Sequence, residues 1–331
     1  MTGEFELIER LKRQLGKTGP NTLVGIGDDC AVTRSSKHLT LLKTDALVEG
    51  VHFSRKWMKP EEVGYKAFAV TLSDIAAMGG LPLHALVSLT LSADCSEAWV
   101  QNVYRGAHKI ANQFRVDIVG GNIAALPERF SMHVFILGKV SKPLLRSGAR
   151  PGDFLVVTGS VGDAAGALSA LSTRKRPYLD KHFPKILKRF VSPKPRIHEM
   201  LRLRKRLNIT SAIDISDGFS SDLTHLARAS HCGFEIDSSK IPISPSLKRL
   251  ASELKISALD CALHGGEDYE ILMTVRVGNT SEIQKIANQL GIRLTVIGKA
   301  TAGREVRLLK PDGTMSALRA QGWDHLRRKL T

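Results

Sequence analysis

Apolar and polar positions follow two periodicities along this chain, one typical of helices and one typical of strands. A spacing of three to four residues predicts helices in the amphipathic stretch 4–16 and in the longer stretch 60–78, which begins at Pro60. Further helices are predicted at 96–114, after Gly162, within 173–207 and at 217–231. Short apolar runs predict strands at 38–45, 84–91, 116–119, 131–140 and 153–158, up to Asp214, and at 233–237, 269–275, 293–299 and 304–309. Helices and strands that alternate in this way indicate an α/β protein.

The elements fall into two successive blocks. The strand at 116–119 is expected to end in Gly120-Gly121-Asn122, and a turn with Gly148, Pro151 and Gly152 separates the blocks. The chain has 331 residues, about twice the length of a typical domain. We therefore expect two α/β domains of unequal length, residues 1–141 and residues 148–331.

Acidic residues stand at the ends of apolar segments or within them, where a lone carboxylate is costly to bury. These residues are Asp28, Asp29, Asp45, Asp74, Asp214, Asp217, Glu267 and Asp268. Glycines beside several of them let the backbone approach a ligand closely. Carboxylate oxygens are also the ligands that Mg²⁺ prefers, and protein-bound Mg²⁺ commonly accompanies phosphates.

Each acid also has a structural alternative. Asp217 could cap its helix, Asp28 could hold a turn, and Asp74 could pair with a buried arginine. Five acidic places in one chain are difficult to explain by caps and turns alone.

Two segments imitate nucleotide loops, but Gly16-Lys17-Thr18 lacks the first glycine of a P-loop, and Gly25-Ile26-Gly27 lacks the third glycine of a dinucleotide fingerprint. The residues therefore favour a phosphate enzyme that uses several magnesium ions and no P-loop.

The charge balance adds a preference for anionic partners. The chain has 48 Lys and Arg against 32 Asp and Glu, a formal net charge of +16, which attracts anions over long distances. The basic residues are dispersed and are not interleaved with aromatic residues, which favours a solvated basic surface over a nucleic-acid interface.

The four cysteines form no CxxC pair, and no apolar stretch resembles a membrane helix or a signal peptide. We expect a cytoplasmic protein with scattered structural thiols.

Seven motifs occur in a fixed order along the chain. They read GIGDDCAV, KTDALVEGVHF, YKAFAVTLSDIAAMGG, RSGARPGD, DISDGFSSDL, GGEDYE and GWDH. Together they resemble the thiamine-monophosphate kinase family, within the superfamily of aminoimidazole ribonucleotide synthetase, selenophosphate synthetase and a hydrogenase maturation factor. The resemblance covers the chain from Gly3 to about His325, and EGVHF, RSGARPGD and GWDH favour this family over its relatives.

The resemblance implies a two-domain aminoimidazole ribonucleotide synthetase-like fold. Its N-terminal α/β domain would bind ATP and several Mg²⁺ ions and form a homodimer through its sheet, and its C-terminal α/β domain would close over the substrate. The implied reaction is direct in-line transfer of the γ-phosphoryl group of ATP to thiamine phosphate, which gives thiamine diphosphate. No catalytic base is required, because the accepting phosphate oxygen is already ionised, so the work consists of alignment and charge neutralisation.

The family pattern also implies roles for single residues. The implied magnesium ligands are Asp29, Thr44, Asp45, Asp74, Asn122, Asp214 and Asp217. The implied ATP contacts are Tyr104, Gly121, Asn122, Arg146 and Ser216. The implied contacts to thiamine phosphate are His52, Glu267 or Asp268, and Trp323. Asp45, Asp74, Arg146 and Asp214 would carry catalysis. Trp323 could instead be a packing anchor, and His52 beside Phe53 could be a core residue.

Two positions depart from the family pattern. The family usually has Asp and then hydroxyl residues after the double glycine, where this chain has Asn122-Ile123-Ala124. Asn122 still offers a carbonyl oxygen but brings no charge. Lys43 stands where the family commonly has Ser, and an ammonium group cannot ligate Mg²⁺, although it could replace one cation electrostatically. The number of magnesium ions is therefore left open.

Three other kinds of function compete with this interpretation, namely another enzyme of the same superfamily, a binding module and a nucleic-acid binder. A selenophosphate synthetase should carry a reactive N-terminal cysteine, and a hydrogenase maturation factor should end in a cysteine-bearing tail; this chain has neither. Aminoimidazole ribonucleotide synthetase is excluded less firmly. The chain could also be a binding module for ATP or thiamine phosphate that turns over poorly, or a nucleic-acid binder, which would show steeply salt-dependent binding.

Overall fold

The computed structural model describes residues 4–15, 20–35, 39–126 and 128–323, which form two compact units. Residues up to 75 and 80–143 belong to the first unit, and residues 76–79 and 144–323 to the second. The look-alike segment Gly16-Lys17-Thr18, the strand start at His38, and the last two residues of GWDH lie outside the described residues.

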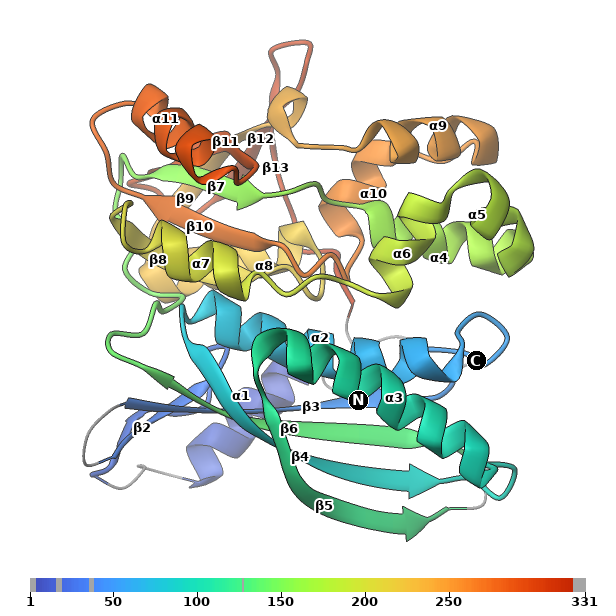
Figure 1. Ribbon diagram of the computed structural model, residues 1–331. Coiled ribbons are helices and arrows are strands. Elements are labelled where there is room, and N and C mark those ends of the chain that lie inside the picture. The colour runs from blue at the N-terminus through green and yellow to red at the C-terminus, as the bar shows by residue number, and fades with distance from the viewer. Residues whose placement is uncertain (1–3, 16–19, 36–38, 127, 324–331) are drawn as a thin grey trace. The chain divides into compact units, whose positions relative to one another are not determined.

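The first unit contains a six-stranded sheet with the order β1-β2-β3-β6-β4-β5. Its strands are β1 (Thr22–Val24), β2 (Ala31–Arg34), β3 (Leu39–Val48), β4 (Leu81–Leu91), β5 (Asp117–Ala125) and β6 (Ser131–Val140). The helices that precede or connect them are α1 (Glu4–Leu15), α2 (Pro60–Ala77) and α3 (Glu97–Phe114). Neighbouring strands pair antiparallel except β4 and β5, which are parallel. Figure 1 shows α2 and α3 together over one face of this sheet.

Helices α2 and α3 approach each other at two glycines. A Cβ atom added to Gly64 of α2 would lie 1.8 Å from the Val103 carbonyl oxygen, and one added to Gly106 of α3 would lie 1.8 Å from the Glu61 carbonyl oxygen. Real side chains do not fit at such distances, so these two glycines permit the close contact of the helix backbones. Helix α3 has an amphipathic pattern, and its buried side includes Val103 and Ile110.

One strand end was predicted wrongly. The strand expected at 116–119 does not stop at Gly120-Gly121-Asn122, because β5 continues through these residues to Ala125 in parallel register with β4. A Cβ atom at Gly121 would lie 1.9 Å from the Val87 carbonyl oxygen of β4. This glycine therefore permits close approach of two strands rather than a turn, which is a recognised use of glycine inside a sheet.

The second unit contains a seven-stranded sheet with the order β13-β12-β9-β11-β7-β10-β8. Its strands are β7 (Phe154–Thr158), β8 (Ile209–Asp214), β9 (Gly233–Asp237), β10 (Ile271–Val275), β11 (Leu294–Thr301), β12 (Val306–Leu309) and β13 (Met315–Ala317). Its helices are α4 (Asp163–Thr173), α5 (Arg176–His182), α6 (Pro184–Val191), α7 (Ile197–Leu203), α8 (Phe219–Ser230), α9 (Pro245–Leu254), α10 (Ala258–His264) and α11 (Thr280–Leu290), with a short 3₁₀ turn at Ser238–Lys240. Helices α9, α10 and α11 were not among the predicted elements.

The core of the second unit lies between this sheet and helix α8. Leu155 and Val157 of β7 point to one face, where they join Ile213 of β8 and Phe219 and Leu223 of α8 in one buried cluster. The intervening residue Val156 is also fully buried, so both faces of β7 are covered. The predicted α/β class is confirmed, since each of the two units combines a mixed sheet with helices.

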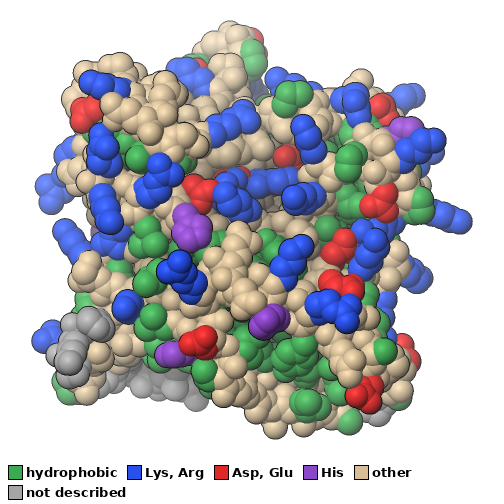
Figure 2. All heavy atoms as spheres, in the orientation of Figure 1, with side chains coloured by type: hydrophobic (Ala, Val, Ile, Leu, Met, Phe, Trp, Pro, Cys, Tyr) green, Lys and Arg blue, Asp and Glu red, His purple; other side chains and the backbone are tan. Residues whose placement is uncertain are grey.

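The surface carries the excess of basic residues that the composition indicates. Figure 2 shows Lys and Arg side chains spread over the visible face and separated by other groups, without one continuous basic band. Among the described residues, no helix is both long enough and apolar enough to cross a membrane.

Candidate active site

Two predicted carboxylates of the first unit contact a lysine, and a third lies beside one of them. Asp74 lies in α2 and Asp45 in β3, and Lys43 shares a face of β3 with Asp45 because alternate residues of a strand point the same way. The Lys43 ammonium lies 2.9 Å from Asp74 Oδ1 and 3.3 Å from Asp45 Oδ1. Asp29, just before β2, offers a carboxylate oxygen within 4.8 Å of one from Asp74. We call Asp29, Asp45, Asp74 and Lys43 the acid group.

The acid group has more negative than positive charge. The group has three carboxylates and one ammonium, and the buried Oδ2 of Asp45 has no hydrogen-bond partner among the residues that the structure describes. A buried carboxylate oxygen without a donor is costly. Oxygen ligands that lie this close together fit a hard cation such as Mg²⁺.

A buried thiol adjoins the acid group. Cys30 is 1% exposed. Burial raises the pKa of its thiol well above the usual range, and the negative charge of Asp74 raises it further. Cys30 is therefore a neutral thiol in this environment, which is not the thiolate form that ligates metals.

The other predicted residues of the first unit lie farther from the acid group. Thr44 is exposed, and its side chain points to the opposite face of β3 from Asp45. A metal ligand from Thr44 on the face of Asp45 would therefore be its backbone carbonyl oxygen. Asn122 is exposed on β5, which is three strands from β3 in the sheet, or about 14 Å at the usual strand spacing. Gly121 adjoins Asn122 on the same strand. Tyr104 is half-buried on α3, and burial raises the pKa of its hydroxyl.

His52 is held by its own backbone segment. Its Nδ1 accepts a hydrogen bond of 3.0 Å from the Val48 backbone N–H, and its backbone N–H donates to the Val48 carbonyl oxygen at 2.9 Å. An accepting Nδ1 leaves the proton of the neutral ring on Nε2. The side chain is half-buried, so Nε2–H can act as a hydrogen-bond donor with a defined orientation.

The predicted residues of the second unit come together from three segments. The backbone N–H of Glu267 donates to the Ser216 carbonyl oxygen at 2.7 Å, which joins GGEDYE to DISDG. The backbone N–H of Trp323 donates to the Asp217 carbonyl oxygen at 2.9 Å. A Cβ atom at Gly266 would lie 2.4 Å from the Ser216 carbonyl oxygen, so the double glycine lets the two loops meet.

A residue that the sequence interpretation did not single out shapes this turn. The fully buried Asp222, in the first turn of α8, accepts hydrogen bonds from the backbone N–H groups of Ser216 and Gly218 at 3.1 and 3.0 Å. Burial raises the pKa of Asp222 well above its usual value, and the negative charges of Asp217 and Asp214 raise it further. Its position four residues after Gly218 in DISDGFSSDL was the available signal, since an acid in a first helical turn can cap preceding amides.

Glu267 and Asp268 have different surroundings. Glu267 is half-buried and has a positive φ of 66°, a conformation that non-glycine residues rarely adopt. Asp268 is buried, and its Oδ2 accepts a 2.7 Å hydrogen bond from the backbone N–H of Gly162, the residue that caps the N-terminus of α4. Burial raises the pKa of Asp268 well above its usual value. Of the two acids, Glu267 is the more accessible to a substrate.

Arg146 lies near the acids of the same turn. It is half-buried, and its charge lowers the raised pKa of Asp222 in part. Burial, together with the charges of Arg146 and Arg228, lowers the pKa of His225 to about 4. His225 is therefore neutral at pH 7, whereas Arg146 supplies positive charge near Asp222.

Family comparisons match both parts of the chain. The family described as AIR synthase related protein, N-terminal domain, matches residues 27–140, and the corresponding C-terminal domain family matches residues 150–310. Thiamine-monophosphate kinase of Escherichia coli K12 is 38% identical over 324 residues, which cover 98% of both chains. Thiamine-monophosphate kinase of Bacillus subtilis strain 168 is 34% identical and covers 98% of this chain and 99% of its own.

A solved structure is similar over almost the whole chain. It is described as AaThiL complexed with AMPPCP and TMP, and it matches with a TM-score of 0.86 and 34% sequence identity. The match covers 98% of this chain and 97% of that one.

Proposed function

Because the chain belongs to the thiamine-monophosphate kinase family, we propose that it transfers the γ-phosphoryl group of ATP to thiamine phosphate, forming thiamine diphosphate. The similar structure that was solved with AMPPCP and TMP supports a pair of substrates of this kind. The thiamine-monophosphate kinase of Escherichia coli K12 and this solved structure are both more than 30% identical to the chain over nearly its full length, which supports the same reaction.

The observation that carries the proposal is the acid group. Three clustered carboxylates, two of which contact one lysine, fit a Mg²⁺-dependent phosphoryl transferase, and so does the Asp45 oxygen that lacks a hydrogen-bond donor. We propose that Asp29, Asp45 and Asp74 hold magnesium in the first unit. In the second unit, Asp214 and Asp217 are the proposed magnesium ligands. Bound Mg²⁺ would neutralise the charge of the phosphates.

The protein's own groups then have to bind and align two anionic substrates. No side chain has to remove a proton, since the accepting phosphate oxygen is ionised at neutral pH. Arg146 is the proposed bidentate donor to ATP phosphates, because a guanidinium group matches two phosphate oxygens at once. Tyr104, Gly121, Asn122 and Ser216 are the other proposed ATP contacts.

The contacts to thiamine phosphate are proposed from three segments. His52 would donate a hydrogen bond through Nε2, whose proton is fixed by the acceptor role of Nδ1. Glu267 would supply a carboxylate, and Trp323 would offer an aromatic face to the cationic thiazolium ring. We assign Asp268 to the support of its loop instead, because its Oδ2 is bonded to the Gly162 amide.

Lys43 reduces the negative charge of the acid group. We propose that its ammonium replaces one cation electrostatically, since it contacts two of the three carboxylates. This chain would then bind fewer Mg²⁺ ions, or bind them more weakly, than a chain with an uncharged residue at position 43.

The exposed edge of the first unit's sheet supports a homodimer. Strand β5 forms one edge, and it carries Val119 and Ile123, which are 60% and 62% exposed. Leu126, which directly follows the strand, is 51% exposed. Exposed edges with apolar side chains are commonly covered by a partner. We propose that a second copy of this chain covers β5.

The test is a chromatographic assay of purified protein with ATP, Mg²⁺ and thiamine phosphate. Stoichiometric thiamine diphosphate, lost on addition of a chelator, is the expected result. Tight binding of ATP and thiamine phosphate without product would instead support the weakened binding protein. Turnover with the substrate of aminoimidazole ribonucleotide synthetase alone would assign the chain to that reaction.

A further inference from the structure

The backbone of residues 321–323 is hydrogen-bonded to one short stretch of the second unit. The Gly322 N–H donates to the Ser221 hydroxyl at 2.9 Å, and the Trp323 N–H donates to the Asp217 carbonyl oxygen at 2.9 Å. Ser221 stands in the first turn of α8, four residues after Asp217 in the chain. We call residues 321–323 the tryptophan segment.

A second serine of the same helical turn extends this contact. The Ser220 hydroxyl accepts a 3.3 Å hydrogen bond from the Gln321 N–H and lies 3.0 Å from His264 Nδ1. Ser220 and Ser221 are both buried. Serine hydroxyls inside helices commonly bond to the backbone of their own helix, whereas these two accept from N–H groups 101 residues away in the chain. They therefore serve as acceptors for the tryptophan segment.

The contact between Ser221 and Gly322 leaves no room for a side chain on the segment. A Cβ atom added to Gly322 would lie 2.3 Å from the Asp217 carbonyl oxygen and 2.5 Å from the Ser221 hydroxyl oxygen. A larger residue at position 322 would push the segment away from both acceptors. Gly322 and Ser221 together set the distance between α8 and the next residue, Trp323.

The neighbouring residues 214–218, which include the proposed magnesium ligands, are held by other groups. The carboxylate of Asp222 accepts hydrogen bonds from the backbone N–H groups of Ser216 and Gly218 at 3.1 and 3.0 Å. These two bonds involve neither the Ser221 hydroxyl nor the tryptophan segment. Loss of that hydroxyl should therefore displace the segment while the magnesium ligands stay in place.

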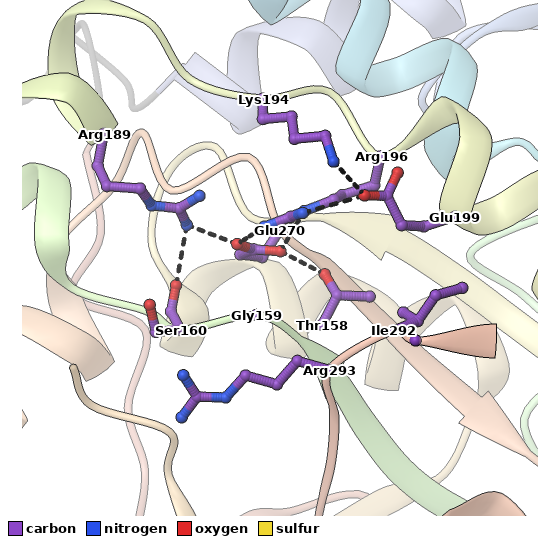
Figure 3. Close-up of a pocket in the computed structure, with 11 residues that line it drawn as sticks. Thr158, Gly159, Ser160, Arg189, Lys194, Arg196, Glu199, Glu270, Ile292 and Arg293 are labelled. Carbon is purple, nitrogen blue, oxygen red and sulfur yellow. Dashed lines mark hydrogen bonds and ion pairs between the residues drawn. The ribbon is translucent and has the colours of Figure 1, made fainter. Parts of the chain in front are cut away.

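A buried cluster of charges anchors the GGEDYE loop, which also contacts residues 214–218. Glu270, the last residue of this loop, is 0% exposed. Its carboxylate accepts hydrogen bonds from two guanidinium groups and one hydroxyl (Figure 3), those of Arg189, Arg196 and Thr158. Two further basic side chains, Lys194 and Arg293, line the adjacent pocket of about 370 Å³. The GGEDYE loop is thus fixed by buried charges, whereas the tryptophan segment donates to uncharged hydroxyl and carbonyl acceptors.

From these contacts we infer that Ser221 is a positioning residue for thiamine phosphate, which acts through Trp323. Its hydroxyl fixes the tryptophan segment and thereby holds the indole in one place, where it can meet the thiazolium ring. The inference rests on the proposed kinase function, because that proposal assigns Trp323 to this ring. Loss of the Ser221 hydroxyl should weaken the binding of thiamine phosphate and spare the binding of ATP.

The experiment is isothermal titration of the full chain with AMPPCP and Mg²⁺, and then with thiamine phosphate at saturating AMPPCP and Mg²⁺. Ser221→Ala should weaken thiamine phosphate binding about five-fold, the usual worth of one hydrogen bond, and should change AMPPCP binding less than about two-fold. Ser281→Ala is the matched control, because Ser281 is an exposed serine in the first turn of α11 in the same unit. It should change either affinity less than about two-fold.

A double-mutant cycle separates positioning from a general structural effect. Trp323→Ala should weaken thiamine phosphate binding about ten-fold, since it removes the aromatic face for the cationic ring. Ser221→Ala should then weaken binding no further in the Trp323→Ala background, because no indole is left to position. An equal loss from Ser221→Ala in both backgrounds would show a structural role and overturn the inference.

Gly322→Ala perturbs the same contact from the other side. Its methyl group should displace the segment and weaken thiamine phosphate binding at least about five-fold. Gly278→Ala, at a glycine whose added Cβ atom meets nothing within 4 Å, should change it less than about two-fold. Unchanged thiamine phosphate binding in both Ser221→Ala and Gly322→Ala would overturn the inference and leave the kinase proposal standing. Absence of thiamine phosphate binding to the unaltered chain would overturn the kinase proposal and, with it, the inference.

Discussion

The acid group of the first unit and the surroundings of Glu270 in the second unit are opposite solutions to the burial of carboxylates. In the acid group, two of the three carboxylates share one ammonium, and Asp45 retains an oxygen without a donor. Around Glu270, one carboxylate receives two guanidinium groups and a hydroxyl, and two further basic side chains remain. The comparison teaches that a buried carboxylate surrounded by its own donors is stabilised without a ligand, whereas an excess of buried carboxylates fits a cation.

The largest effect is expected from the acid group. Asp45→Asn removes a negative charge and should lower the rate of thiamine diphosphate formation about 10² to 10³-fold, the range seen when one electrostatic stabiliser of a transition state is lost. The rate is measured by chromatography at saturating ATP and Mg²⁺. Asp117→Asn is the matched control, because Asp117 is an exposed aspartate on β5 of the same unit. An Asp45→Asn enzyme as active as this control would contradict a cation site at Asp45.

The next effect concerns the stability of the second unit. Glu270→Gln removes the fully buried carboxylate that binds Arg189 and Arg196, which keep Asp163 and Glu199 as acidic partners, and should lower the free energy of unfolding by about 3 kcal/mol. Urea denaturation followed by circular dichroism measures the change. Glu305→Gln, at an exposed position in the same unit, should stay within about 0.5 kcal/mol. A small loss at position 270 would mean that the two arginines find other partners.

A smaller effect depends on pH. The pKa of His225 is lowered to about 4 by burial and by Arg146 and Arg228, whereas the unfolded chain has the usual value near 6.5. The unfolded state therefore binds more protons between these two values, and the stability contributed by the neutral ring is present above pH 6.5 and lost as pH falls towards 4. After allowance for partial exposure, the loss is on the order of 2 kcal/mol.

The measurement compares urea denaturation at pH 7 and pH 4.5 in the unaltered chain and in His225→Gln. The variant cannot gain a proton at this position and should lose less stability between the two pH values. Equal losses in the two proteins would show that the basic surroundings do not suppress protonation of His225.

The smallest effect tests whether Lys43 acts as a built-in cation. Lys43→Ser removes the ammonium and should lower the apparent dissociation constant for Mg²⁺ by about three- to ten-fold, because the three carboxylates lose a competing positive charge. Titration calorimetry with Mg²⁺ measures this change without turnover. Lys43→Arg keeps the charge and serves as the control. A rise in activity of Lys43→Ser with unchanged Mg²⁺ affinity would reject the role.

Several of these features were predictable from the sequence, and others were not. Asp45 and Asp74 stood out because carboxylates inside apolar segments need a partner, and Lys43 stood out because it replaced an uncharged residue of the family pattern. The role of Gly121 was misjudged, since a glycine pair is typical of a turn as well as of close strand contact. The contacts of Glu270 had no local signal, because Arg189 and Arg196 lie 81 and 74 residues away in the chain. Only the pairing of β7, β10 and the α6–α7 segment brings them together.

Cys30 gives the acid group a reporter of its own. Cys30 in the first unit and Cys232 in the second are both buried, with 1% and 2% exposure, whereas Cys95 and Cys261 are partly accessible. A buried thiol reacts with a disulfide reagent only while its surroundings are open. The rates of the slow labelling phases therefore measure how often each unit opens. Mg²⁺ that stabilises the acid group should slow the labelling of Cys30, and the labelling rate of Cys232 serves as an internal reference.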